Sequence, residues 1–388
     1  ECGICGGDGI ADSVCDCAGN VEDCAGICNG DAIEDECGVC DGDSLSCFGT
    51  DSTLDIITWN IEQFPKQGET TIEYLVEIIQ SSEIDIIALQ EIDSETDFNN
   101  LVNELDGWSG YRANSASLDL AYLYKSELTI ISIEEIESFE NYYFPRTPLQ
   151  MEIKWEGEYI YIINNHFKCC GNGTIENEYD DEEYRRMMAS QELQDYVDLY
   201  YPDEKVLILG DLNDEITEPQ TQNVFWNFIS NPNEYQFADM SIAEGSSDDW
   251  SYPGWPSHLD HIIISNELFN FVYDVSCIKY EESLENGWSE YDNYITDHRP
   301  VGIQLYWING CTDPLSCNYD PDATVDDGSC LENDCAGECG GDAEEDNCGT
   351  CDNDPDNNCE QENNCLYLHE GANLVSFSTL PLNGLYDI

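Results

Sequence analysis

The sequence predicts an α/β fold for the long central part of the chain, residues 51–308. Short apolar runs alternate there with segments whose apolar residues recur at helical spacing. Cysteines are nearly excluded from this part, which holds 3 of the 21, against 9 in residues 1–50 and 9 in residues 309–388. A stretch of this length can bury a core of its own, whereas short cysteine-rich flanks depend on cross-links. We therefore expect disulfide-rich, irregular flanks around an α/β domain.

The predicted strands are short, apolar and often β-branched, and polar loops with Gly or Pro follow most of them. They are Leu54–Trp59, Asp85–Gln90, Leu120–Lys125, Tyr159–His166, Lys205–Gly210, His258–Ser265 and Val301–Trp307. Helical spacing predicts helices at Thr70–Ser81 and Asp181–Tyr200. The second helix opens with acidic residues, which suit the positive end of the helix dipole.

The chain is strongly acidic, with 83 Asp and Glu against 11 Lys and Arg and a net charge of −72. All 11 basic residues lie between Lys66 and Arg299, and with 52 acidic residues they give the central part a charge of −41. This charge favours cations and repels polyanions, so it counts against a tight binder of duplex nucleic acid. An acidic surface that merely keeps the protein soluble in salty water is the simpler explanation.

The flanks repeat a small module. Asp23–Asp43 aligns without gaps on Asp334–Asp354, with 15 of 21 positions identical. A second pattern, Cys311–Cys330, mixes Cys, Asp and Asn with Pro and Gly. Gly permits tight turns, and closely spaced Asp offers oxygen ligands to a hard cation such as Ca²⁺. Disulfides with Ca²⁺ and purely structural disulfides both stay open, whereas carboxylates beside every cysteine pair count against zinc ribbons.

These flanks resemble the calcium-binding, thrombospondin type-3-like repeats of extracellular proteins. The resemblance implies an extracellular or cell-surface location. No apolar run in the sequence approaches the length of a membrane span. Because the sequence starts inside a cysteine pattern and ends after an apolar run, we expect a longer protein that attaches to the surface through parts outside this chain.

Polar residues with chemical potential stand at the ends of the predicted strands. In chain order they are Asn60 and Glu62 (TWNIEQF), Glu91 (LQEI), His166 (NNHFK), Asp211 and Asn213 (GDLND), Asp260 (HLDHI), and Asp297 with His298 (TDHRP). Any one of them could be a hydrogen-bonded structural residue, since an unpaired polar side chain beside a buried strand is costly. So many in one domain favour a functional site.

This series resembles the endonuclease/exonuclease/phosphatase superfamily, in which deoxyribonuclease I, exonuclease III, inositol polyphosphate phosphatases and bacterial sphingomyelinases are found. The motifs W-N, Q-E, mid-domain H, G-D-x-N, D-H-I and D-H-R-P-V occur here in family order. The resemblance implies a deoxyribonuclease-I-like sandwich of two mixed sheets flanked by helices, with the site at one sheet edge. The expected division is repeats in 1–50, this domain in 51–308, repeats in 309–364 and the start of a further domain in 365–388.

A metal site follows from the chemistry of phosphate esters, which need charge neutralised on their oxygens. Mg²⁺ or Mn²⁺ takes oxygen ligands, and one or two carboxylates suffice. Glu91 is the predicted principal ligand. By resemblance, Asn60 and Glu62 support the same ion, and Asp297 assists at the metal or at the leaving oxygen.

Five further residues are predicted to act on the phosphate or on the attacking water. Asp211 would orient or deprotonate the water, and Asn213 would donate to the phosphate or hold the metal-bound oxygen. His298 would contact the phosphate as a cation, with Asp260 fixing its tautomer and raising its pKa. By resemblance, His166 lies near the scissile phosphate.

Three neighbouring residues receive weaker assignments. Lys168 could reach a phosphate, although a surface lysine is an equal reading. His261 should point away from Asp260 and be structural, whereas the alternation of a strand places His258 on the same face as Asp260.

Cys169 and Cys170 follow Lys168 directly. Neighbouring cysteines seldom bond each other, because the geometry strains the peptide. Cys277 is the third cysteine of the central part. We expect these residues to staple a loop near the site, and not to act as a nucleophile, since a metal already supplies activated water.

The favoured function is a secreted, metal-dependent phosphoesterase, most plausibly an extracellular nuclease. One alternative is a phosphatase or phospholipid phosphodiesterase. Another is a calcium-dependent adhesion or scaffold protein with a secondary catalytic domain. Every motif position carries a chemically competent residue, which favours an active enzyme over a vestigial one.

Overall fold

The computed structural model describes residues 53–114, 117–139, 141–321, 323–345 and 351–352, together with Cys15 and Cys28. The chain divides into two compact units, Glu1–Ile308 and Asn309–Ile388. The expectations for the rest of residues 1–50 and for 365–388 lie outside the described residues.

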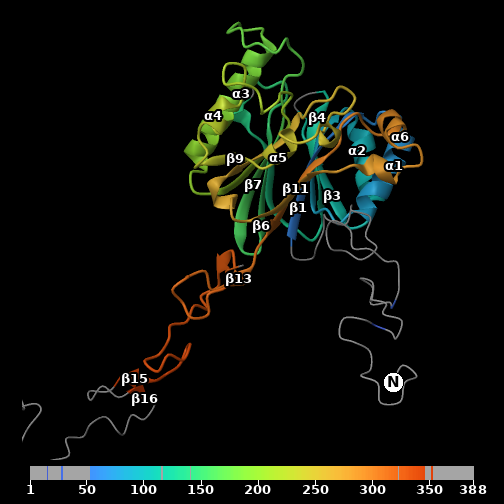
Figure 1. The fold of residues 1–388 in the computed structure, drawn as a ribbon. Coiled ribbons are helices and arrows are strands. Elements are labelled where there is room, and N and C mark those ends of the chain that lie inside the picture. Colours follow the sequence, from blue (N-terminus) through green and yellow to red (C-terminus); the bar gives the residue numbers. More distant parts are fainter. Residues whose placement is uncertain are drawn as a thin grey trace, which may run out of the picture. The chain divides into compact units, whose positions relative to one another are not determined.

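The first unit contains two six-stranded mixed sheets (Figure 1). In spatial order, the first sheet consists of β11 (Val272–Cys277), β12 (Val301–Tyr306), β1 (Thr53–Phe64), β2 (Ile86–Ile92), β4 (Asp119–Lys125) and β3 (Trp108–Arg112). The second consists of β5 (Thr129–Glu135), β6 (Leu149–Trp155), β7 (Glu158–His166), β8 (Lys205–Asp211), β10 (Asp260–Ser265) and β9 (Tyr235–Phe237). β1 pairs with β2, and β7 with β8, in parallel, while the other neighbours are antiparallel.

The two sheets are joined face to face by buried side chains that cross between them. The hydroxyl of Tyr122 on β4 donates to the carbonyls of Leu149 (3.0 Å) and Ile162 (2.8 Å) in the second sheet. The amide of Gln90 donates to Asn164 Oδ1 at 2.8 Å. Buried polar groups need such partners, so these bonds fix how the sheets stack.

Helices cover the outer face of each sheet (Figure 1). Apolar residues of α1 (Glu69–Ser81), α2 (Glu95–Glu104) and α6 (Trp288–Tyr294) form one core with the first sheet. Residues of α3 (Glu182–Tyr200), α4 (Trp226–Ile229) and α5 (Met240–Ala243) form another with the second. Short 3₁₀ turns occur at Glu137–Phe139, Ser247–Asp249, Asn266–Leu268 and Tyr280–Ser283. The predicted two-sheet sandwich with flanking helices is therefore confirmed.

The second unit has little regular structure. Disulfides join Cys311 to Cys330, Cys317 to Cys339, and Cys335 to Cys351. Its two-residue strands are β13 (Asn309–Gly310), β14 (Val325–Asp326), β15 (Glu344–Glu345) and β16 (Cys351–Asp352). Cys15 is bonded to Cys28 in the other flank. The prediction of disulfide-rich flanks holds for these eight cysteines, which offer no thiolates to zinc.

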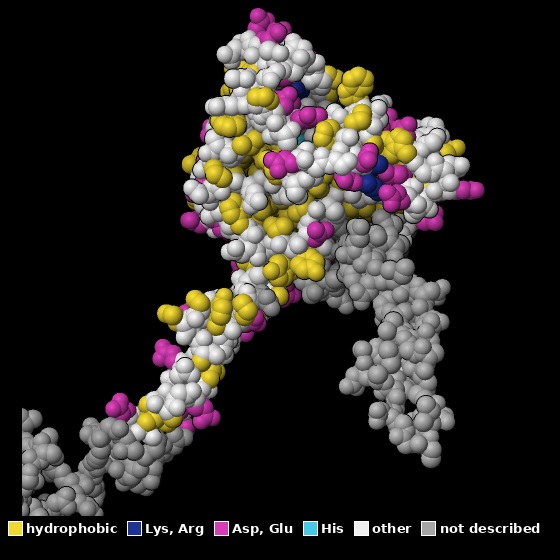
Figure 2. Space-filling view, in the orientation of Figure 1, with side chains coloured by type: hydrophobic (Ala, Val, Ile, Leu, Met, Phe, Trp, Pro, Cys, Tyr) yellow, Lys and Arg dark blue, Asp and Glu magenta, His cyan; other side chains and the backbone are white. Residues whose placement is uncertain are grey.

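Among the described residues, no helix is both long and apolar enough to span a membrane. On the visible face of the central unit, Asp and Glu are widely scattered and Lys and Arg are few (Figure 2).

Candidate active site

Strand pairing brings the predicted site residues to one edge of the sandwich. In the second sheet His166, at the end of β7, pairs in register with Asp211, at the end of β8. Asp211 also pairs with Asp260, the first residue of β10. In the first sheet Asn60 on β1 pairs with Gln90, the residue before Glu91. Parallel neighbours end at the same sheet edge, so the polar residues that follow them gather there.

A hydrogen bond between the sheets closes the centre of the site. The Asn60 amide donates to Asp211 Oδ2 at 2.9 Å, and both side chains are buried. The backbone N–H of Asn213 donates to Asp211 Oδ1 at 3.1 Å, and its amide donates to the Phe167 carbonyl at 3.3 Å. Asp211 is thereby held between the two sheets.

The three predicted carboxylate ligands, Glu62, Glu91 and Asp297, form the more exposed half of the site. Glu62 accepts from the backbone N–H of Asp297 at 3.2 Å and is paired with Lys66. Glu91 Oε2 accepts from the Gln63 N–H at 3.0 Å, and Glu91 Oε1 lies 3.8 Å from His166 Nε2. Each carboxylate thus keeps acceptor capacity for a cation.

The predicted acid–base residues form the buried half. His298 Nδ1 lies 2.7 Å from Asp260 Oδ2, and His166 Nε2 lies 3.4 Å from Asp211 Oδ2. Ligand atoms of Asp211, Asp260 and His298 all lie within 4.8 Å of one another. Because His298 Nδ1 is already bonded to Asp260, we assign Asp211, Asp260 and His298 to proton transfer and not to metal binding.

Burial and charge separate the proton affinities of Asp211, His298 and His166. Burial raises the pKa of Asp211 to about 7; Asp260 and Glu91 add to the increase, while His298 and the Asn60 amide oppose it. Burial lowers the pKa of His298, but the Asp260 carboxylate outweighs it and raises the pKa to about 10. Burial, with Arg146 and His298 nearby, holds the pKa of His166 well below its usual value. A cationic His298 therefore faces a neutral His166, the kind of contrast that acid–base sites require.

The chemistry of the donor set fits a hard divalent cation. Glu62, Glu91 and Asp297 offer carboxylate oxygens, which Mg²⁺ and Mn²⁺ prefer. Burial raises the pKa of Glu62 and Asp297 adds to the increase, while the paired Lys66 opposes it.

Backbone strain is concentrated at the same residues. Glu62 (φ 30°), Glu91 (φ 66°) and Asn213 (φ 57°) have positive φ, although none is glycine. Such conformations cost roughly 1–3 kcal/mol each and persist where the surroundings enforce them. At all three positions the strained turn directs a polar side chain to the sheet edge.

Lys168 is the predicted site residue that the geometry directs elsewhere. Its ammonium donates to the Cys169 carbonyl at 3.0 Å, within its own loop. The expected cysteine staple is also wrong: Cys169, Cys170 and Cys277 are all free. Cys277 lies on β11 of the first sheet, whereas the cysteine pair follows β7 of the second.

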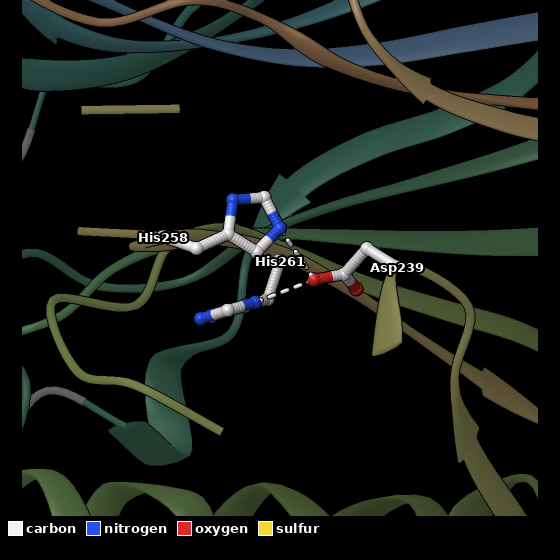
Figure 3. Close-up of side chains that lie close together, drawn as sticks. All are labelled: Asp239, His258 and His261. Carbon is white, nitrogen blue, oxygen red and sulfur yellow. Dashed lines mark hydrogen bonds and ion pairs between the residues drawn. The ribbon is translucent and has the colours of Figure 1, made fainter. Parts of the chain in front are cut away.

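Asp239, His258 and His261 form a second buried cluster (Figure 3). Asp239 Oδ2 lies 2.6 Å from His261 Nδ1 and 3.1 Å from His258 Nε2. The structural reading of His261 agrees with this, but the placement of His258 on the Asp260 face is wrong. His258 precedes β10, so strand alternation does not apply to it. His261 Nε2 also bonds the Asp214 carbonyl at 2.9 Å, which ties the cluster to the Asp211–Asn213 turn.

Two side chains beside the site were not predicted from sequence. Arg146 lies close enough to Glu91 and Asp211 to interact with both charges. The Tyr252 ring lies 4.8 Å from the His298 ring. The sequences around them, FPRTP for Arg146 and SYPGW for Tyr252, match no motif of the family, so neither residue could be assigned a role from sequence.

Comparison with known proteins identifies the fold and the family of the chain. No curated protein matches the chain in sequence. Among solved structures, D. rerio TDP2 complexed with a single-strand DNA product is 15% identical, with a TM-score of 0.51 over 66% of this chain and 99% of that one. A humanized D. rerio TDP2 is 14% identical, with a TM-score of 0.50 over 65% and 98% of the two chains. A Bacteroides vulgatus endonuclease/exonuclease/phosphatase is 11% identical, with a TM-score of 0.49 over 66% and 98%.

At 14% and 15% identity, the similarities to the two D. rerio structures bear on the fold alone. The model of the endonuclease/exonuclease/phosphatase family matches residues 57–298, from β1 to the Asp297–His298 pair. That span includes every residue of the candidate site, and the chain belongs to the endonuclease/exonuclease/phosphatase family.

Proposed function

We propose that this chain is a secreted, divalent-metal-dependent phosphodiesterase that hydrolyses nucleic acid. The observation that carries the proposal is the buried Asp211 held between the sheets, with a cationic His298 on one side and the carboxylates of Glu91 and Glu62 on the other. Family membership supports the coarser activity, hydrolysis of phosphoester bonds.

The residues divide the reaction between them. Glu91, Glu62, Asn60 and Asp297 would hold Mg²⁺ or Mn²⁺, which supplies Lewis acidity at the phosphate when bound. Asp211 accepts the proton of the attacking water, because its pKa of about 7 matches a general base near neutral pH.

The remaining residues act on the phosphate. His298 donates from Nε2 to a non-bridging oxygen, since its Nδ1 is held by Asp260. That donor is already oriented, and it stabilises charge that grows in the transition state. Asn213 fixes the position of Asp211 through its backbone N–H.

An aromatic stack beside the site favours nucleic acid as the substrate. The rings of Tyr142 and Tyr179 stack with centroids 3.9 Å apart, and the Arg185 guanidinium lies 4.1 Å from the Tyr142 ring. Tyr179 is 60% exposed, so a further planar group can continue the stack. The chain connects the stack to the catalytic edge, because Phe144, two residues after Tyr142, packs on Phe167, which follows His166. Base stacking on such rings contributes about 1–3 kcal/mol per base. The single-strand DNA product in the D. rerio TDP2 complex accords with this substrate class.

Secretion is supported by the disulfides in the flanks, which form in oxidising compartments. Ca²⁺ binding by the flanking repeats stays a proposal that rests on their Asp spacing.

One observation favours a lipid phosphodiesterase as the second candidate. Trp255 is 78% exposed and lies in the same loop as Tyr252, which contacts His298. Exposed Trp residues bind well at membrane interfaces.

The test uses the full chain with Mg²⁺, Mn²⁺ or Ca²⁺. Substrates are single-stranded DNA, duplex DNA, RNA, bis-p-nitrophenyl phosphate and sphingomyelin. The variants are Glu91→Gln and His298→Asn, with Glu77→Gln on the exposed face of α1 as the matched control. Metal-dependent cleavage of nucleic acid, lost in the two site variants and kept in the control, supports the proposal.

Turnover of sphingomyelin alone moves the assignment to the lipid enzyme. Turnover of bis-p-nitrophenyl phosphate alone indicates a phosphodiesterase for small substrates. If a folded, metal-loaded chain hydrolyses nothing, the adhesion scaffold becomes the better explanation.

A further inference from the structure

Cys169 and Cys170 are neighbours in the chain and also at their sulfur atoms. Both side chains are exposed, neither belongs to a disulfide, and the Cys170 thiol donates to Cys169 Sγ at 2.9 Å. The Lys168 ammonium lies 3.6 Å from Cys169 Sγ and so places a positive charge beside this sulfur. An oxidant in solvent can reach both thiols.

The surrounding turn holds the two residues in this arrangement. Cys170 has φ 73° and Gly171 has φ 116°. The buried guanidinium of Arg186 donates to the carbonyls of Lys168 and Cys170, both at 2.7 Å. At Gly171 a Cβ would overlap the Glu183 carboxylate, so only glycine fits. Helix α3 thus fixes the main chain on both sides of the Cys169–Cys170 peptide.

We propose that Cys169 and Cys170 are an oxidation site that closes into a vicinal disulfide. The two thiols lose two protons and two electrons, and a small-molecule disulfide takes them up and leaves as two thiols. The first step is attack of one cysteine thiolate on the oxidant, which gives a mixed disulfide. The second cysteine then displaces the remaining thiol and forms the Sγ–Sγ bond.

Ring strain makes this bond easy to reduce again. Cα atoms across a trans peptide are about 3.8 Å apart, whereas unstrained disulfides span about 4.4–6.8 Å. Strained, exposed disulfides are more oxidising than structural ones. The Cys169–Cys170 disulfide should therefore have a less negative reduction potential than the disulfides of the second unit. It lies in the turn that follows β7, the strand that ends at His166.

The test is peptide mapping of the full chain after incubation with oxidised glutathione. Trypsin cuts after Lys168 and after Arg185, so both cysteines fall in one peptide, while Cys277 falls in another. The expected peptide is lighter by two hydrogen atoms and resists alkylation, whereas Cys277 stays free. In Cys170→Ser, Cys169 should instead retain glutathione, because no neighbouring thiol displaces it.

Graded reduction with dithiothreitol completes the test. The Cys169–Cys170 bond should open at a lower dithiothreitol concentration than Cys311–Cys330. Alkylation of both residues after oxidation, or a cross-link from either to Cys277, overturns the proposal. Opening no earlier than Cys311–Cys330 overturns the strain argument. None of these readouts depends on phosphoesterase activity.

Discussion

Replacing Asp239 by Asn should destabilise the central unit strongly, although the two side chains have nearly the same shape. The Asp239 carboxylate is 0% exposed. It accepts from His261 at 2.6 Å, from His258 at 3.1 Å and from the backbone N–H of Ile262 at 2.9 Å. All three partners act as donors here.

The protonation of the partners follows from their other contacts. His258 Nδ1 accepts from the Ser251 N–H at 3.3 Å, so its proton is on Nε2. His261 faces a carbonyl oxygen with one nitrogen and the carboxylate with the other, so both nitrogens carry protons. An Asn side chain has one acceptor and one donor. In either orientation its NH₂ meets an N–H, and the cation of His261 loses its counter-charge.

Breaking a buried ion pair from one side costs about 3–5 kcal/mol. Urea unfolding of the full chain, followed by tryptophan fluorescence, measures the loss. The matched control is Asp249→Asn, the same change at an exposed pair in which Asp249 lies 2.6 Å from Lys279. Exposed pairs contribute about 0–1 kcal/mol. The reasoning fails if Asp239→Asn costs no more than Asp249→Asn.

The pH dependence of stability gives an independent readout of the same cluster. The pKa of Asp239 is lowered, because its histidine partners outweigh burial. Its contribution is therefore present above the unfolded pKa and is lost as pH falls through the folded value. The pKa of His261 is raised, because Asp239 outweighs burial. That contribution is present below the unfolded pKa and is lost as pH rises through the folded one. Asp239→Asn should therefore make the free energy of unfolding depend less on pH, on both the acidic and the basic side.

Three further predictions concern activity. His298→Asn should lower kcat about 10²–10⁴-fold with little change in KM, as steady-state kinetics would reveal; an equal rise in KM would indicate a binding role. Tyr179→Ala should raise KM for single-stranded DNA about tenfold or more and leave bis-p-nitrophenyl phosphate turnover unchanged; a loss on both substrates would contradict the stacking role. Removal of divalent ions with EDTA should abolish turnover without loss of the circular dichroism of the sandwich, and Mg²⁺ or Mn²⁺ should restore it; metal-independent turnover would refute the assigned ligand set.

The strands predicted from sequence all lie inside the two sheets. β1, β2, β7, β8, β10 and β12 are buried nearly throughout, so they read as continuous apolar runs. All four edge strands, β3, β5, β9 and β11, were missed, and so was one interior strand, β6. Three of them are mostly half-exposed, and β9 has only three residues. An edge strand has neither an apolar run nor enough length to stand out from a loop.

Most of the candidate site could be predicted from sequence, because each strand end carries its own motif. The parallel pairing of β1 with β2, and of β7 with β8, then brings those strand ends together. What stayed hidden depends on partners far along the chain. His258 and His261 find Asp239, 19 and 22 residues earlier, and no local pattern marks that aspartate. The ammonium of Lys168 turns to the carbonyl of the next residue, which only the backbone of the turn decides. The contact between the sulfur atoms of Cys169 and Cys170 likewise depends on a distant residue, Arg186, which donates to the carbonyls of Lys168 and Cys170.

The net charge of −72 misleads about phosphate binding, because the position of the few basic residues matters more than their number. Seven of the 11 are paired with carboxylates. Within the described residues, four basic side chains have no such partner: Arg146, Lys154, Lys168 and Arg185. Arg146 lies in the loop before β6, Lys168 in the loop after β7, and Arg185 in the first turn of α3. Arg146 and the cationic His298 both lie close enough to Asp211 to interact with its charge, so positive charge stands beside the residue proposed to activate the water. The acidic surface elsewhere opposes long-range attraction of a polyanion, a repulsion that salt screens within a few ångströms at about 1 M ionic strength. An enzyme built this way should release its product readily and act on nucleic acid best in salty surroundings.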